Sequence, residues 1–172
     1  MRLRSIIVST ALLALLALPQ AACDEPAMEA PPKAKPTPAP VFKLMTLEGK
    51  QVTLADYAGK PLIVNFWASW CAPCIKEMPE LESFYFKKKA DGLELLMVNL
   101  KESKETVASF LKDNNFAFHV LLDESGKASE DFQVFGLPST YFIDRKGVIQ
   151  NRHMGSLTRE ILYAGFGDIT GK

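Results

Sequence analysis

The stretch Asn65-Phe66-Trp67-Ala68-Ser69-Trp70-Cys71-Ala72-Pro73-Cys74 decides how this chain folds. Leu62-Ile63-Val64 precedes it, and the apolar, β-branched run from Leu62 to Phe66 is typical of a buried parallel strand. The strand leads straight into two cysteines three positions apart, and the proline between them suits the first turn of a helix. We therefore predict a strand-to-helix junction that places the cysteine pair at the N-terminus of a helix.

The chemistry of this junction gives each cysteine a different task. Unpaired backbone N–H groups and the helix dipole favour the thiolate of Cys71, which makes it the expected nucleophile. Cys74 lies on the same helical turn, so it can resolve a mixed disulfide formed by Cys71. Pro73 costs no hydrogen bond in the first turn, and Ala72 leaves the approach to an exposed Cys71 sulfur open. Trp70 is either an apolar platform beside that sulfur or a simple packing residue.

Two cysteines at this spacing are also half of a structural zinc site, which requires four ligands. The other candidates are His119, His153 and Cys23, and no second pair stands at ligand spacing. Cys23 lies beyond a linker, and each histidine is expected to be an ordinary surface or core residue. We therefore expect no metal and no bound cofactor, with the disulfide of Cys71 and Cys74 as the redox group.

Strand and helix patterns alternate through a domain predicted to cover residues 41–172. Such alternation predicts an α/β fold, in which helices flank both faces of a central sheet, and a C-terminal hairpin makes that sheet mixed. The expected elements are a hairpin of 42–46 and 51–54, strands at 62–66, 93–100 and 120–122, a helix over 106–111, a hairpin of 140–143 and 147–149, and a closing helix from Leu157 to about Gly165.

The N-terminal segment has the composition of an export signal. Arg2 and Arg4 precede an apolar run from Ile6 to Leu18, and Ala21-Ala22 follow directly before Cys23. The run is shorter than the roughly 20 residues that a membrane-spanning helix needs. We predict a signal peptide over residues 1–22 that is cleaved off, with an uncleaved membrane anchor as the alternative.

Cys23 and its neighbours resemble a bacterial lipoprotein signal, in which the cysteine is lipidated and becomes the mature N-terminus. Gln20 stands where that pattern usually has an aliphatic residue, so cleavage by the ordinary signal peptidase is the alternative. Asp24 resembles the signal that keeps enterobacterial lipoproteins in the inner membrane. Pro, Ala, Lys and Thr dominate Pro26 to Pro40, so residues 23–40 are predicted to be an extended tether. The expected location is the periplasmic side of the inner membrane, with a soluble periplasmic protein as the alternative.

Composition narrows the choice of partners. A chain of 172 residues with 48% hydrophobic content suits one compact domain with a single core. Its 20 basic and 20 acidic residues cancel, so no field of one sign attracts nucleic acid or anionic lipid. We therefore expect no nucleic-acid partner.

Three motifs in order along the chain carry a family resemblance. They are the stretch from Asn65 to Cys74, then Lys76-Glu77-Met78-Pro79-Glu80-Leu81, then Gly136-Leu137-Pro138-Ser139-Thr140-Tyr141-Phe142-Ile143-Asp144. Together they closely resemble the TlpA/ResA/CcmG branch of extracytoplasmic thioredoxin-like proteins, and the likeness extends from Val41 to Leu162. The resemblance implies a thioredoxin-like fold with an N-terminal β-hairpin and a central strand-helix insertion.

The same resemblance assigns roles to further residues. It implies a cis bond between Leu137 and Pro138, in a loop that faces the cysteines, pairs with the substrate chain and obstructs metal capture by the thiols. Pro79 matches a proline that kinks the active-site helix. The resemblance thus implies substrate-binding roles for Leu137 and Pro138. Together with Trp70, Ala72 and Pro73 beside the cysteines, they are the expected substrate-binding residues.

One departure from thioredoxin itself concerns proton transfer. Asn65 stands where thioredoxin has a buried Asp, and an amide cannot exchange a proton at ordinary pH. Glu77 falls on the apolar side of the predicted helix beside Cys74, where burial would raise its pKa towards the range useful for accepting the Cys74 proton. The alternative is a glutamate on the helix surface. Glu102, which follows the second central strand, is expected to be a solvated loop carboxylate.

These observations predict a thiol-disulfide oxidoreductase that acts on exported proteins. The resemblance points to a reductase of cysteine pairs, such as those of apocytochrome c before haem attachment, with a membrane protein linked to cytoplasmic thioredoxin as electron donor. A general periplasmic disulfide reductase or isomerase and a metallochaperone-like binding module are the alternatives. A peroxidase of the peroxiredoxin type is disfavoured, because its reactive cysteine would lack an adjacent partner. We expect a monomer.

Overall fold

The computed structural model describes residues 35–171. The predicted signal peptide, Cys23 and most of the predicted tether lie outside these residues. Among the described residues no helix combines the length and the apolar composition needed to cross a membrane. The strands are β1 (Thr37–Pro38), β2 (Lys43–Thr46), β3 (Gln51–Thr53), β4 (Leu62–Trp67), β5 (Glu94–Leu100), β6 (Val120–Asp123), β7 (Ser139–Ile143) and β8 (Val148–Met154). The helices are α1 (Ala72–Lys88), α2 (Lys104–Asp113), α3 (Lys127–Asp131) and α4 (Arg159–Thr170), with 3₁₀ turns at Leu54–Tyr57 and Lys89–Asp91.

One mixed sheet organises these elements. Its eight strands stand in the order β1-β8-β7-β4-β5-β6-β2-β3. The central strand β4 runs parallel to β5 and antiparallel to β7, and all six of its residues are buried. The predicted N-terminal hairpin is β2 and β3, which pair antiparallel, and the predicted C-terminal hairpin is β7 and β8. The expected mixed α/β fold is therefore confirmed.

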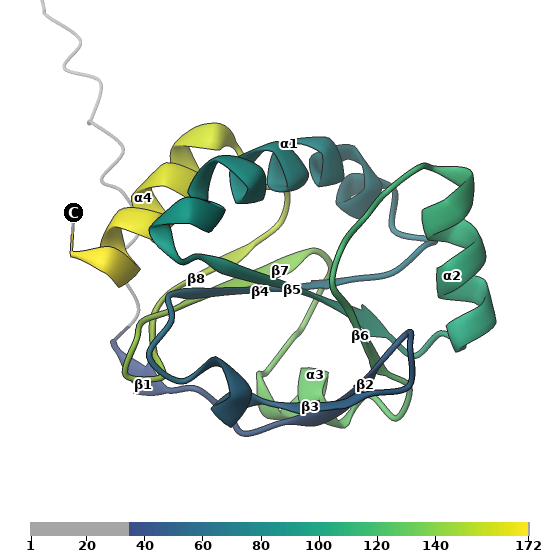
Figure 1. Cartoon of the computed structure of the whole chain (residues 1–172), viewed down its shortest axis with the longest axis horizontal. Helices are drawn as coiled ribbons and strands as arrows, with labels where there is room; N and C mark the ends of the chain where they lie inside the picture. The colour runs from purple at the N-terminus through teal and green to yellow at the C-terminus, as the bar shows by residue number, and fades with distance from the viewer. Residues whose placement is uncertain (1–34, 172) are drawn as a thin grey trace, which may run out of the picture. The chain divides into compact units, whose positions relative to one another are not determined.

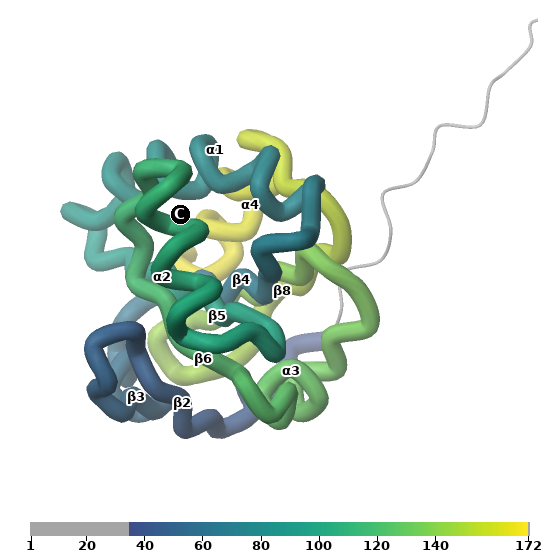
Figure 2. Tube along the Cα trace, turned by 90° about the vertical axis from the view of Figure 1, so that its right-hand side faces the viewer, coloured from purple at the N-terminus to yellow at the C-terminus, as the bar shows by residue number. Residues whose placement is uncertain are grey.

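Helices cover both faces of the sheet. Figure 1 shows α1 and α4 across one face with α2 beside them, while α3 lies on the other face, toward which the sheet curls at its β2–β3 edge; Figure 2 shows the same arrangement after a quarter turn. The expected single core is wrong, because the sheet divides it into two. Alternate residues of β4 serve these two cores, since successive side chains in a strand point to opposite faces. Ile63 and Trp67 pack on the face of α1, whereas Val64 and Phe66 pack in the second core with Phe132.

The domain begins a few residues before the predicted start at Val41. Thr37 and Pro38 pair with Ile149 and Val148, and the Ala39 amide donates to the Gly147 carbonyl at 2.9 Å. Proline lacks an N–H, but at the edge of a sheet one side of a strand needs no partner, so Pro38 is tolerated there. The end of the segment predicted to be a tether is thus part of the sheet.

The closing helix extends beyond the predicted end at about Gly165. It begins after Thr158, whose hydroxyl accepts a hydrogen bond from the Ile161 amide, and it continues to Thr170. Gly165 lies inside it because α4 passes very close to β7. A Cβ at this position would stand 2.3 Å from Cε1 of Phe142, so glycine here permits packing and does not end the helix.

Helix α3 is an element that the sequence patterns do not predict. It is only five residues long, too short for a periodic apolar pattern. Its first turn is capped by a residue of the preceding strand. The buried Asp123 carboxylate at the end of β6 accepts hydrogen bonds from the amides of Ala128 and Ser129 at 3.1 and 2.7 Å. Asp123 thus joins β6 to α3.

Candidate active site

The cysteine pair occupies the predicted strand-to-helix junction. Cys71 is the N-cap of α1 and is joined to Cys74 by a disulfide. The Cys71 sulfur accepts a hydrogen bond from the Cys74 amide at 3.3 Å, and the Cys71 carbonyl accepts one from the Ile75 amide at 3.1 Å. Pro73 lies in the first turn, where a missing N–H costs nothing. The end of the helix therefore offers its free amides and its positive dipole to the Cys71 sulfur.

The two cysteines are more covered than the sequence suggests. Cys71 is 5% exposed and Cys74 is 1% exposed, so the predicted exposed sulfur of Cys71 is largely shielded in the disulfide form. Trp70 next to it is 69% exposed, which excludes simple packing in the core as its role. The disulfide is open on the side where Cys71 lines a hollow together with Trp70.

An apolar hollow of about 550 Å³ lies on that side of the disulfide. The Leu137–Pro138 peptide bond is cis, as the resemblance implies, and Pro138 itself is buried. Phe135 in the same loop is 80% exposed, so its ring and Trp70 are large apolar surfaces that no part of the described domain covers. The walls of the hollow include Trp70, Cys71, Ala72, Pro73, Phe135 and Leu137.

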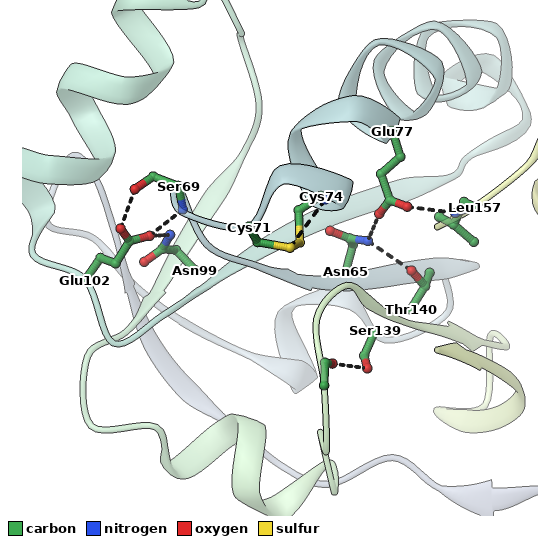
Figure 3. The surroundings of a disulfide bond; sticks show 11 residues. Asn65, Ser69, Cys71, Cys74, Glu77, Asn99, Glu102, Ser139, Thr140 and Leu157 are labelled. Carbon is green, nitrogen blue, oxygen red and sulfur yellow. Dashed lines mark hydrogen bonds between the residues drawn. A yellow bond between two sulfur atoms is a disulfide. The ribbon is translucent and has the colours of Figure 1, made fainter. Parts of the chain in front are cut away.

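Glu77 is buried on the side of α1 that faces the sheet. It is 4% exposed, as the helical spacing predicts, and this excludes a solvated surface glutamate. Its Oε1 accepts a hydrogen bond from Asn65 Nδ2 at 2.9 Å, and its Oε2 accepts one from the Leu157 amide at 2.7 Å (Figure 3). Burial raises the pKa of Glu77, and the two hydrogen bonds, which favour the ionised form, oppose that rise in part. The proton-transfer role of Glu77 stays a prediction.

Asn65 joins Glu77 to the neighbouring strand. It is fully buried on β4, and its Nδ2 also donates to Thr140 Oγ1 on β7 at 2.9 Å. The amide oxygen of Asn65 has no hydrogen-bond partner among residues 35–171. In Figure 3 this oxygen is turned toward the two cysteines and away from Glu77.

The expectation that Glu102 is a solvated loop carboxylate is wrong. Its Oε2 accepts hydrogen bonds from the Ser69 amide and from Asn99 Nδ2, both at 2.7 Å, and its Oε1 accepts one from the Ser69 hydroxyl at 2.5 Å (Figure 3). Glu102 follows β5, and Ser69 belongs to the turn that follows β4. Because neighbouring parallel strands end at the same edge of the sheet, the carboxylate can hold the turn that leads into Cys71.

The two histidines have partners other than the cysteines. His119 Nε2 is 2.9 Å from the Tyr57 hydroxyl, and His153 Nε2 is 3.2 Å from the Ser156 carbonyl. No group of three or more His, Cys, Asp or Glu side chains in the described part of the chain is arranged to hold a metal ion. Pro79 lies inside α1, where it removes one backbone hydrogen bond.

Sequence reasoning missed the polar residues that support the site. Thr140, Ser69 and Asn99 were not identified as contributors. Asn99 is a polar residue within the otherwise apolar strand β5, where it pairs with Trp67 of β4. A polar side chain in such a strand indicates a buried hydrogen bond, because buried polar groups are almost always paired. The contact partners themselves depend on strand register, which single residues do not reveal.

A disulfide of the Cys-Xaa-Xaa-Cys type at a helix N-terminus, beside a cis-proline loop on a mixed sheet, defines a thioredoxin-like disulfide-exchange protein. Comparison with family models agrees: the chain belongs to the AhpC/TSA family, whose model matches residues 36–152. The chain is a thiol-disulfide oxidoreductase.

Individual relatives point the same way. The chain is 40% identical to the thioredoxin-like protein YneN of Bacillus subtilis over 125 residues, covering 71% of this chain and 72% of the relative. It is 36% identical over 124 residues to the thiol-disulfide oxidoreductase ResA of Bacillus thuringiensis, covering 72% of each. Among solved structures, a putative thiol:disulfide interchange protein DsbE from Chlorobium tepidum aligns with a TM-score of 0.71 and 30% identity, covering 79% of this chain and all of that one. StoA from Bacillus subtilis aligns with a TM-score of 0.64 and 32% identity, covering 74% and 96%.

Proposed function

We propose that this chain is exported, is tethered to the outer side of the cytoplasmic membrane through Cys23, and reduces disulfides in exported proteins. The cysteine pair of apocytochrome c before haem attachment is the proposed substrate. The observation that carries the proposal is the Cys71–Cys74 disulfide, which opens at one side into an apolar hollow between Trp70 and the Leu137 loop. Such a hollow suits an extended chain with an apolar residue next to its cysteine, because apolar surface is buried on binding.

The reaction begins with the reduced protein. The Cys71 thiolate, which the helix N-terminus stabilises, attacks one sulfur of the substrate disulfide and releases the other as a thiolate, which takes up a proton. Cys74 then loses its proton and attacks the Cys71 sulfur of the mixed disulfide, so the second substrate sulfur leaves and is protonated. Two electrons pass to the substrate, and the Cys71–Cys74 disulfide is restored. No bound cofactor is needed.

Glu77 is the proposed acceptor of the Cys74 proton. It lies one helical turn after Cys74, it is buried, and its raised pKa brings it closer to that of a thiol. The proposed electron donor is a dithiol of a membrane protein, which would reduce the Cys71–Cys74 disulfide by the same exchange in reverse. The Pro-rich segment before Thr37 would hold the domain away from the bilayer.

A defined peptide tests the substrate class. The probe is a synthetic Cys-Xaa-Xaa-Cys-His peptide in its disulfide form, which is the haem-attachment pattern. The reduced Cys74→Ser variant is expected to form a stable mixed disulfide with it through Cys71, detected by mass spectrometry. Cys71→Ser is the matched control and is expected to form none. Equal trapping of an unrelated disulfide peptide would favour a general reductase or isomerase, and no trapping at all would count against both.

The direction of electron flow is tested by the reduction potential. Equilibration of the protein with glutathione or dithiothreitol buffers is expected to give a value near that of thioredoxin, at about −270 mV or lower. A value near about −120 mV, as in the oxidant DsbA, would contradict the proposed reductase.

A further inference from the structure

The buried amide of Asn65 contains one polar atom that the oxidised site does not use. Its nitrogen has two acceptors, Glu77 Oε1 and Thr140 Oγ1, each at 2.9 Å. Its oxygen has none within the described residues, although the side chain is fully buried. Buried polar atoms in proteins almost always have a hydrogen-bond partner, so an unpaired oxygen at this position indicates a role in the function of the site.

The Glu77 carboxylate determines which way this amide points. An ionised carboxylate can only accept hydrogen bonds, so Asn65 must present its nitrogen to Glu77. The other end of the same amide is then the carbonyl oxygen, and Figure 3 shows it directed at the cysteine pair. The Thr140 hydroxyl can either donate or accept a hydrogen bond, so it does not determine the orientation of the amide; here it accepts from the Asn65 nitrogen.

We propose that Asn65 is a positioning residue for the resolving step: its amide oxygen accepts a hydrogen bond from the Cys74 thiol whenever the disulfide is reduced, and Glu77 sets the orientation that makes this possible. The inference rests on the proposed function only in that Cys71 and Cys74 must cycle between disulfide and dithiol. Reduction by two electrons and two protons creates an S–H donor beside an acceptor that the disulfide leaves unused.

The helix geometry selects Cys74 over Cys71 as the donor. Cys74 and Glu77 are three positions apart on α1, and side chains at this spacing lie on one face with their Cβ atoms about 5–6 Å apart. Asn65 reaches Glu77 from beneath that face, so its free oxygen lies below Cys74. Cys71 is the N-cap, and its sulfur already accepts a hydrogen bond from the Cys74 amide.

This contact would keep the two cysteines in different protonation states. A hydrogen bond donated by a thiol stabilises the neutral form, so Cys74 stays protonated while Cys71 ionises and attacks. Glu77, three positions after Cys74 on α1, is the proposed acceptor of the Cys74 proton once the mixed disulfide has formed. Glu77 contacts Asn65 on β4 and the Leu157 amide before α4, Thr140 on β7 contacts Asn65, and Cys74 stands one turn earlier on α1. His153 on β8 is the strand partner of Thr140, and its Nε2 lies 3.2 Å from the carbonyl oxygen of Ser156.

Infrared spectroscopy of the S–H stretch tests the contact directly, because a hydrogen-bonded S–H absorbs at lower wavenumber than a free one. The protein is the full chain with Cys23→Ser and Cys71→Ser, which leaves Cys74 as its single thiol. Its S–H band is expected below that of an alkanethiol in carbon tetrachloride. Adding Asn65→Leu is expected to shift the band up to that of the free thiol. Asn99→Leu is the matched control, since Asn99 is also buried with an unpaired amide oxygen but binds Glu102, and it should leave the band in place.

Glu77→Gln supplies a second test in which residue 65 is still asparagine. The glutamine oxygen can stay with the Leu157 amide, so its NH₂ group faces Asn65 and forces the Asn65 amide to turn over. The Asn65 nitrogen then points at Cys74, and the low-wavenumber shift is expected to be lost. A free-thiol band in the starting protein, or an unchanged band in either folded variant, overturns the proposal. If Asn65→Leu does not fold, Glu77→Gln decides alone. The spectra need no substrate, so they are independent of whether the protein is a reductase.

Discussion

Replacing Glu77 by glutamine should change how the stability of the domain depends on pH. Burial raises the pKa of Glu77 in the folded protein above its ordinary value of 4.5. Below pH 4.5 the carboxyl is protonated in both the folded and the unfolded chain. Between pH 4.5 and the folded pKa, only the unfolded chain has lost the proton. The unfolded state then binds fewer protons, so the free energy of unfolding falls as pH rises through this interval.

The magnitude follows from the size of the pKa rise. For each unit by which the pKa of Glu77 in the folded protein exceeds its pKa in the unfolded chain, the free energy of unfolding falls by about 1.4 kcal/mol. The full loss is reached once the pH is above both pKa values. Glutamine does not titrate, so Glu77→Gln lacks this loss. The stability of the variant relative to the parent protein should therefore increase with pH by the same amount, on top of a constant difference due to altered hydrogen bonds.

The assay is urea unfolding of the oxidised protein at several pH values from 4 to 8, because the disulfide removes Cys71 and Cys74 from the titration. Glu105→Gln is the control, since Glu105 is an exposed carboxylate on α2. The difference in stability between Glu77→Gln and the parent should change with pH more than the difference for the control. A Glu77 difference that stays constant from pH 4 to 8 would refute the argument that burial raises the pKa of Glu77.

Three further outcomes are expected. Cys74→Ser should retain full affinity for substrate but accumulate the mixed disulfide through Cys71, measured as a gel shift that dithiothreitol reverses; a variant that turns over normally would contradict the assigned roles. Glu102→Ala removes the acceptor of all three hydrogen bonds, so urea unfolding should show a loss of about 1–3 kcal/mol, and an unchanged midpoint would show that the carboxylate does not hold the turn. Gly165→Ala drives a methyl group into Phe142 and should lower stability by about 1–3 kcal/mol despite the better helix propensity of alanine; a gain in thermal midpoint would mean that α4 moves away at no cost.

The main features of the site could be predicted because they depend on local chemistry. The short apolar run before Cys71 and the proline after it determine a strand-to-helix junction within a few residues. The burial of Glu77 followed from its position three residues after Cys74 on a helix with an apolar side. The cis bond before Pro138 was predicted only through the family resemblance, since nothing in the local sequence requires it.

The rest depends on contacts between distant parts of the chain. Glu102 looked like a solvated loop residue because its three donors come from other segments, two from Ser69 and one from Asn99. Gly165 looked like the end of a helix because its close contact with Phe142 is a tertiary contact. Helix α3 was missed because its cap is supplied by Asp123, in the preceding strand. In each case strand order and register supply the missing information.

The two ends of the sheet are short and poorly suited to accept another strand. One edge is β1, with two residues of which Pro38 has no N–H to donate, and the other is β3, with three residues. Chains with unpaired strands can pair with any open sheet edge that they meet. Long open edges would bind such chains along the backbone and aggregate with them. The short edges of the described sheet therefore disfavour strand pairing with another chain, while the hollow beside Cys71 stays open.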